Sequence, residues 1–272
     1  MTQIKALEDQ IARLGSVVAA AENWAPQYAK DPNGHAKIIK LEGSIEYHMR
    51  NYLRALANER VMHYVDWSRY NGQVVRAYDV NVTILDDQIG QEDGFLLTAL
   101  HDPLLTGMAI GAQAGEIIYG TPLGITATDT ALMEAARNYS AKLVTQITET
   151  TRDKIKQSIS TSLQLNEDQS TAVARLQQVI RDPKRAGTIA RTEAVNSYTQ
   201  GLLNFGTQSN AVAKEWQALD AVDDCADLDG QTIAIDDTFA NGGDDGPPLH
   251  PNCRCGLRLI YSNENWSDAN AD

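Results

Sequence analysis

Three cysteines and one histidine lie within the last fifth of this 272-residue chain. Cys225 stands alone in the stretch DDCADLDG, whereas His250, Cys253 and Cys255 stand together in GPPLHPNCRCGL. Thiolate sulfur and imidazole nitrogen are the ligands that zinc prefers, and structural zinc sites use four of them in a tetrahedron. The four residues therefore predict a structural Zn²⁺ site with a Cys₃His ligand set.

The spacing of these residues leaves other readings open. Only one residue separates Cys253 from Cys255, whereas zinc ligand pairs usually have two to four residues between them. The alternatives are packing or hydrogen bonding without metal, a disulfide between Cys225 and one of the pair, and a nucleophile formed by a cysteine with His250. An odd number of cysteines and the lack of a visible signal peptide disfavour a disulfide framework. The pattern also shows no general base for a catalytic zinc.

The sequence pattern changes after residue 208, in the segment that must position these residues. AKEWQAL and GQTIAI alternate like strands and are separated by loops rich in Asp and Gly. We expect a small β-rich Cys/His module over residues 209–261, with Trp216 as its core anchor. A module of this size has little core, which makes a staple plausible. Asp229 and Gly230 imitate the start of a calcium loop, but the remaining ligand positions do not fit, so we interpret them as a turn.

Upstream of this module the pattern is helical. Ile4, Leu7, Ile11, Leu14 and Val18 form an apolar seam, so the helical N-terminal region, residues 1–90, is predicted to dock on a partner. After the DPNG break we expect a helix over 36–69 and a strand or an extended connector over 74–87. The prediction is a mainly α protein with an extended helical N-terminal region and a small C-terminal α+β module, ending in a mobile tail over 262–272.

A second helical region is expected over residues 91–208. Pro103 and the turn at 119–124 punctuate it, and one long helix is predicted over 130–163. NEDQ at 166–169 indicates a cap with Asn166 as N-cap residue, RDPKR at 181–185 ends that helix, and the next begins near Ala186.

The charge of the chain is unevenly distributed. The formal net charge is −13, and residues 209–272 hold 3 Lys and Arg against 13 Asp and Glu. Such an acidic module repels phosphates, which argues against its binding nucleic acid. Contact with protein or DNA is left to the near-neutral N-terminal helices or to residues 152–208, whose net charge is +3. The most apolar segment is interrupted by polar residues, so no membrane span is expected.

Arg191 and Glu193 in IARTEAV are two residues apart on a predicted helix and therefore lie on different faces. We expect each side chain to pair with a partner elsewhere and to fix the helix against the terminal module.

The order of these motifs resembles the phage head morphogenesis family, the Mu F-type minor head proteins of tailed phages. The resemblance covers residues 185–260 and rests on Arg191-Thr192-Glu193, Trp216, Leu228-Asp229-Gly230 and the run from His250 to Cys255. Many members of the family have a Cys-x-x-Cys pair before Leu-Asp-Gly. Here the first of these positions is Val222, so this chain either completes a family metal site with His250 or lacks that site.

The resemblance implies a non-enzymatic minor capsid protein in the virion head, at the portal vertex or in the capsid interior, present in multiple copies and made in the host cytoplasm. The implied partners are the portal protein and the major capsid protein, and the implied roles are head assembly, DNA packaging or ejection. The alternative is a zinc-dependent hydrolase or a toxin-like effector delivered with the genome.

Overall fold

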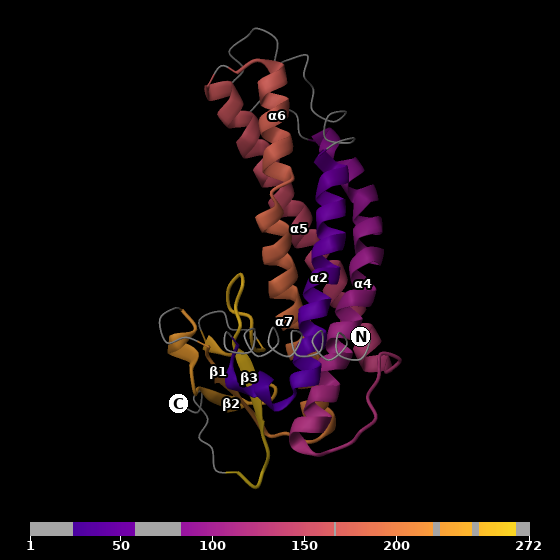
Figure 1. Ribbon diagram of the computed structural model, residues 1–272, viewed down its shortest axis with the longest axis vertical. Helices are drawn as coiled ribbons and strands as arrows, with labels where there is room; N and C mark the ends of the chain where they lie inside the picture. Colours follow the sequence, from indigo (N-terminus) through magenta and orange to yellow (C-terminus); the bar gives the residue numbers. More distant parts are fainter. Residues whose placement is uncertain (1–23, 58–82, 166, 220–223, 241–244, 265–272) are drawn as a thin grey trace, which may run out of the picture. The chain divides into compact units, whose positions relative to one another are not determined.

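The computed structural model describes residues 24–57, 83–165, 167–219, 224–240 and 245–264. It is mainly helical and carries one small antiparallel sheet near the C-terminus, which confirms the predicted fold class (Figure 1). The predicted apolar seam between Ile4 and Val18 lies outside the described residues, as does most of the predicted tail. No helix in the described ranges has the length and apolar character needed to span a bilayer.

The chain forms two compact units that are not continuous in sequence. Unit 1 comprises the described parts of Met1–Gly43, Leu104–Ala136 and Arg191–Asp272, and unit 2 those of Ser44–Pro103 and Arg137–Ala190. The predicted segments 1–90, 91–208 and 209–261 therefore differ from the units that form. The reason is that four long helices each contribute to both units, so a compact unit gathers pieces from distant parts of the chain. These helices are α2 (Pro32–Ala55), α4 (Thr83–Tyr119), α5 (Thr130–Gln164) and α7 (Pro183–Gln208).

The helices begin at residues that can satisfy exposed backbone N–H groups. α2 (Pro32–Ala55) follows Asp31, whose Oδ1 accepts a hydrogen bond from the Gly34 N–H at 3.0 Å. The DPNG break is thus the start of the helix, because Asp caps the first turn and Pro fits a position that needs no donor. Before it stands a short 3₁₀ helix, η1 (Pro26–Lys30).

The next two helices are long. α4 (Thr83–Tyr119) continues through Pro103, the last residue of unit 2 on this helix, and α5 (Thr130–Gln164) agrees with the predicted 130–163. The strand or extended connector predicted over 74–87 is wrong from Thr83 onward, where the chain is helical, and residues 74–82 lie outside the described residues.

Two further helices complete the helical part, α6 (Gln169–Ile180) and α7 (Pro183–Gln208). The N-cap of α6 is Asp168, whose carboxylate accepts from the Thr171 N–H at 2.8 Å, so the prediction of Asn166 as N-cap is corrected. Asp is as good a cap as Asn, and the helix starts two residues later than the four-residue pattern suggested. α7 begins at Pro183 rather than near Ala186, because proline is well suited to a first helical turn.

The sheet has three antiparallel strands in the order β2-β1-β3. β1 (Ala213–Gln217) is central, between β2 (Thr232–Ala234) and β3 (Gly256–Ile260). Alternate residues of β1 serve different faces, as a two-residue period requires. Lys214 and Trp216 both lie against Phe239, whereas Glu215 pairs across the ladder with Arg258 at 2.9 Å.

Within unit 1, α4 and α7 approach each other closely at glycines. A Cβ atom on Gly111 would lie 1.9 Å from the Tyr198 carbonyl oxygen, and one on Gly201 would lie 1.8 Å from the Met108 carbonyl oxygen. Only hydrogen atoms fit there, so the two backbones can touch. The ring of Tyr119 at the end of α4 then stacks on Phe205 of α7 at 6.1 Å between centroids.

Replacing Gly111 with alanine is expected to destabilise the protein by about 1–3 kcal/mol, because a backbone carbonyl cannot move aside as a flexible side chain can. The matched control is Gly43→Ala in α2, where an added Cβ would meet nothing within 4 Å. Alanine favours a helix by about 0.5–1 kcal/mol over glycine, so this control should be neutral or stabilising. Thermal melts of both variants test the contrast, which equal losses would contradict.

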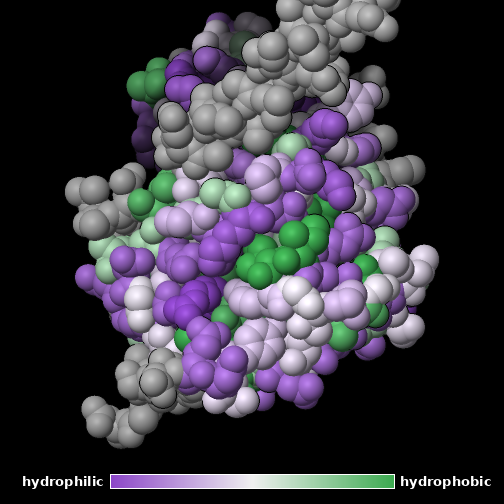
Figure 2. Space-filling model, turned by 60° about the horizontal axis from the view of Figure 1, so that its bottom comes forward, coloured by the Kyte–Doolittle hydropathy of each residue, from purple (hydrophilic) through white to green (hydrophobic). Residues whose placement is uncertain are grey.

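Unit 1 also exposes several large apolar side chains near the connection between α4 and α5. Ile117, Leu123 and Met133 are 60%, 40% and 39% exposed. Figure 2 shows apolar side chains gathered among polar ones on the face that it views. A surface of this kind is available to a protein partner.

Candidate functional site

The three cysteines of the chain meet in unit 1. Cys225 stands directly before the 3₁₀ turn η4 (Ala226–Leu228), and Cys253 and Cys255 stand directly before β3. Their sulfur atoms all lie within 4.8 Å of one another, and the Cys225 and Cys253 sulfurs are 3.8 Å apart. The side chains are buried, with exposures of 0%, 1% and 3% in chain order, and none forms a disulfide. We call this group the thiol cluster.

Hydrogen bonds in the thiol cluster favour a negative charge on one sulfur. The pKa of Cys253 is lowered, chiefly because the Cys255 side chain donates a hydrogen bond to its sulfur, with further donation from the backbone N–H groups of Cys255 and Leu249. Burial opposes this shift. The pKa of Cys255 is raised by its hydrogen bond to Cys253 and by burial, although the Leu219 N–H donates to its sulfur. The cluster thus favours a thiolate at Cys253 over one at Cys255.

His250 does not belong to the thiol cluster. The group of potential metal ligands found among the described residues contains only the three cysteines, and the His250 Nδ1 lies 3.0 Å from the Pro251 carbonyl oxygen. The structure therefore brings together three of the four residues predicted as zinc ligands. The His250 imidazole is not among the ligand atoms that lie within 4.8 Å of one another, which adjacency in sequence could not reveal.

Arg254, between the two clustered cysteines, holds the segment that precedes α2. Its guanidinium carbon lies 3.9 Å from the centre of the Trp24 ring. Both terminal nitrogens bond to the Glu42 carboxylate, one of them at 3.1 Å. The Arg254 carbonyl also accepts from the Ala25 N–H at 3.1 Å. Along Cys253-Arg254-Cys255 the side chains therefore alternate: the two sulfurs lie in the thiol cluster, and the arginine contacts Trp24 and Glu42.

The same segment reaches the cluster through Tyr28. Its hydroxyl donates to the Cys255 carbonyl at 3.2 Å, and its ring lies 5.2 Å from that of Tyr198. Sequence reasoning missed Trp24, Tyr28 and Glu42 as supports of the terminal module. The available signal was the isolated pair of aromatic residues in NWAPQY, within an otherwise polar stretch.

Arg191 ties α7 to the His-Pro-Asn turn. Its Nε donates to the Asn252 Oδ1 at 2.6 Å, and the Asn252 N–H donates to the Thr192 hydroxyl oxygen at 3.1 Å. Asn252 has a φ of 63°, a left-handed conformation that asparagine tolerates better than most residues. Glu193 is 8% exposed on the same helix. Arg191 thus makes the kind of contact with the terminal module that we expected.

Asp229 and Gly230 form a turn at the end of β1. The Asp229 carboxylate accepts from the Ala218 N–H at 2.8 Å, and Gly230 has a φ of 75°, which glycine adopts without a steric cost. The Gly230 N–H donates to the Trp216 carbonyl at 2.9 Å. These residues hold the loop that carries Cys225, which agrees with their interpretation as a structural turn.

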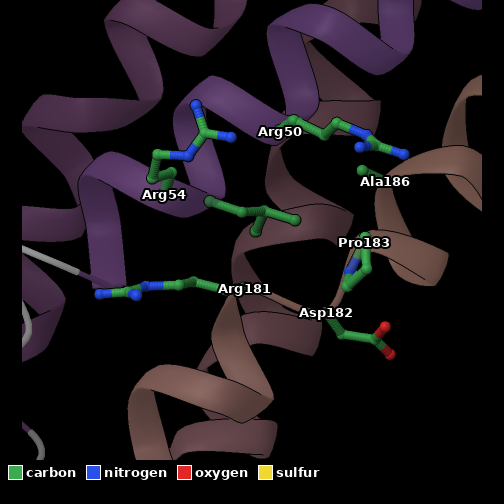
Figure 3. A pocket seen from close by; sticks show the side chains of 7 residues that line it. Arg50, Arg54, Arg181, Asp182, Pro183 and Ala186 are labelled. Atoms are coloured by element: carbon green, nitrogen blue, oxygen red, sulfur yellow. The ribbon is translucent and has the colours of Figure 1, made fainter.

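Unit 2 has a pocket of about 140 Å³ lined by three arginines, Arg50, Arg54 and Arg181, together with Leu53, Asp182, Pro183 and Ala186. Figure 3 shows the three guanidinium groups pointing in different directions rather than toward one point. This arrangement presents a positive surface but does not enclose a single anion.

A comparison with known protein families relates part of the chain to one of them. Residues 153–258 match the family described as Phage Mu protein F like protein. This region of the chain, 106 of its 272 residues, is similar to the Mu F-like phage head morphogenesis family. The match begins at Asp153 in α5, well upstream of the motifs at 185–260 that carried the resemblance, and ends within β3. No curated protein and no solved structure matches the chain.

The Mu F-like region contains the whole thiol cluster and its supporting turn, from α6 to β3. Trp24, Tyr28 and Glu42, which contact this module, lie outside the matched residues. The match supports a phage head-related protein, with a virion location and capsid-related partners.

Proposed function

We propose that this protein is a minor head protein of a tailed phage, which associates with the portal protein and acts in head assembly, DNA packaging or ejection. The match of residues 153–258 to the Mu F-like family carries the proposal. The protein would lie at the portal vertex or in the capsid interior, in multiple copies, with the major capsid protein as a further neighbour.

A structural rather than enzymatic role is supported by the burial of the thiol cluster. Reactive cysteines are partly accessible and lie in electropositive surroundings, because a substrate must reach the sulfur. The three thiols here are at most 3% exposed. The buried cluster gives no support to the alternative, a zinc-dependent hydrolase or toxin-like effector.

The N-terminal apolar seam, from Ile4 to Val18, is the proposed contact with the portal. Trp24 and Tyr28 are 6% and 2% exposed and pack on the terminal module, so the docking element must end before them. A truncation that separates docking from folding should therefore begin at Asn23, since removing Trp24 would also remove part of the core.

Deleting residues 1–22 is expected to abolish co-sedimentation with purified portal protein while leaving the thermal melting temperature of the chain within about 2 °C. A full-length variant with Ile4, Leu7, Ile11 and Leu14 replaced by serine keeps the chain length and should behave in the same way. The measurement is the fraction of chain that sediments with portal rings at matched concentrations.

A matched variant tests the other surface available to the portal. Ile117→Ser combined with Leu123→Ser removes two exposed apolar side chains of unit 1 and should leave sedimentation unchanged. If this variant loses binding while the truncated chain binds fully, the portal contact lies on the α4–α5 connection. The assignment of the contact to the N-terminal seam would then be wrong.

Weak contact with packaged DNA, as a further part of this proposal, would fall to the arginine-lined surface of unit 2. Phosphate contacts need cations, and Arg50, Arg54 and Arg181 line one exposed pocket there. Residues 209–272 instead carry thirteen acidic residues against three basic ones and would be repelled by phosphate.

A further inference from the structure

We propose that Cys225, Cys253 and Cys255 bind one zinc ion as three thiolates, with the fourth coordination position filled by a group other than His250. The inference rests on the geometry of the thiol cluster and is independent of the role in the phage head.

The separation of the sulfurs fits coordination by a shared ion. Zinc–sulfur bonds of about 2.3 Å in a tetrahedron place two sulfurs about 3.8 Å apart. The Cys225 and Cys253 sulfurs are 3.8 Å apart, and the third sulfur lies within 4.8 Å of both. A disulfide would need a sulfur–sulfur distance of about 2.05 Å.

The burial of the sulfurs also suits a structural metal site. The three cysteine side chains are at most 3% exposed, and structural zinc sites are closed, with all four coordination positions filled.

A zinc ion at this position would join two segments of the module that lie far apart in the sequence. Cys225 belongs to the loop between β1 and β2, whereas Cys253 and Cys255 precede β3. The shared ion would close the loop between residues 225 and 253, which restricts the unfolded chain as a disulfide does. β2 has only three residues, so a cross-link here adds stability where the ladder is short.

The site would also extend its effect to the N-terminal segment through Arg254. Its neighbours in the chain are two of the ligands, and its own side chain holds Trp24 and Glu42. Zinc would fix the backbone of the CRC run and thereby the position of this arginine. Removal of zinc is expected to increase amide hydrogen exchange at residues 24–30, and unchanged exchange after complete metal loss would refute this coupling.

The experiment is native mass spectrometry of the full chain, purified under reducing conditions and titrated with Zn²⁺. We expect one zinc per chain, removed by a strong chelator together with part of the thermal stability. Cys225→Ser, Cys253→Ser and Cys255→Ser should each weaken zinc binding by at least about 100-fold. His250→Ala is the matched control and should still bind one zinc, because its ring lies outside the thiol cluster.

A second measurement, Co²⁺ binding to the unmodified chain, tests the same ligand set even if a serine variant fails to fold. Co²⁺ should give the intense visible bands of a tetrahedral site and sulfur-to-cobalt charge transfer of a strength typical of three thiolates. Three thiols that titrate freely in the presence of zinc would overturn the proposal, as would a mass two daltons low from a disulfide. Loss of zinc from His250→Ala equal to that of the cysteine variants would overturn the three-thiolate ligand set.

Discussion

Replacing Trp216 with alanine is expected to destabilise the protein by about 3–5 kcal/mol, the largest effect of a single substitution that the fold indicates. Trp216 is fully buried in the central strand and meets Phe239 edge-on, with 5.3 Å between ring centroids. It also stands opposite Leu257 of β3. Removing the indole would leave a cavity in a module whose sheet has only three strands and cannot collapse to fill it.

Denaturant unfolding followed by circular dichroism measures this loss. Tyr47→Ala is the control, because Tyr47 is also a large aromatic side chain but is 64% exposed. Surface substitutions of this kind usually change stability by less than about 0.5 kcal/mol. A loss below about 1 kcal/mol for the Trp216 variant would mean that the module does not depend on this ring for its core.

Replacing Arg254 with methionine is expected to cost about 3 kcal/mol, because the change breaks a largely buried ion pair and leaves the Glu42 carboxylate without its guanidinium. The two side chains are 15% and 16% exposed, so water compensates only in part. The variant also loses the contact of the guanidinium with the Trp24 ring, worth about 1 kcal/mol. Methionine keeps much of the aliphatic length, which isolates the charge.

Arg258→Met is the matched control for this prediction. Arg258 pairs with Glu215 and Glu264, but its side chain is 35% exposed and exposed pairs contribute at most about 1 kcal/mol. Thermal melts give the two losses, and limited proteolysis near residues 24–30 should accelerate only in the Arg254 variant. Equal melting temperatures for the two variants would refute the special role of Arg254.

Local sequence patterns identified much of the fold because local physical rules act on them. The apolar period from 130 to 163 produces a helix over Thr130–Gln164, and alternation around Trp216 produces β1. A 3.6-residue or two-residue period places apolar side chains on one face whatever packs against it. The turn at Asp229-Gly230 could also be predicted from local sequence, because the backbone at Gly230 is left-handed and that conformation favours glycine.

The sequence by itself determined most element types, the cysteine-rich terminal module and the family that residues 153–258 resemble, although the helix that begins at Thr83 was not expected. Only the tertiary structure decided which residues meet across long separations. It placed Trp24 and Glu42 on Arg254, divided long helices between two units, and left His250 outside the thiol cluster. The physical reason is that secondary structure follows from neighbours along the chain, whereas a ligand set or a buried ion pair depends on where turns direct side chains in space.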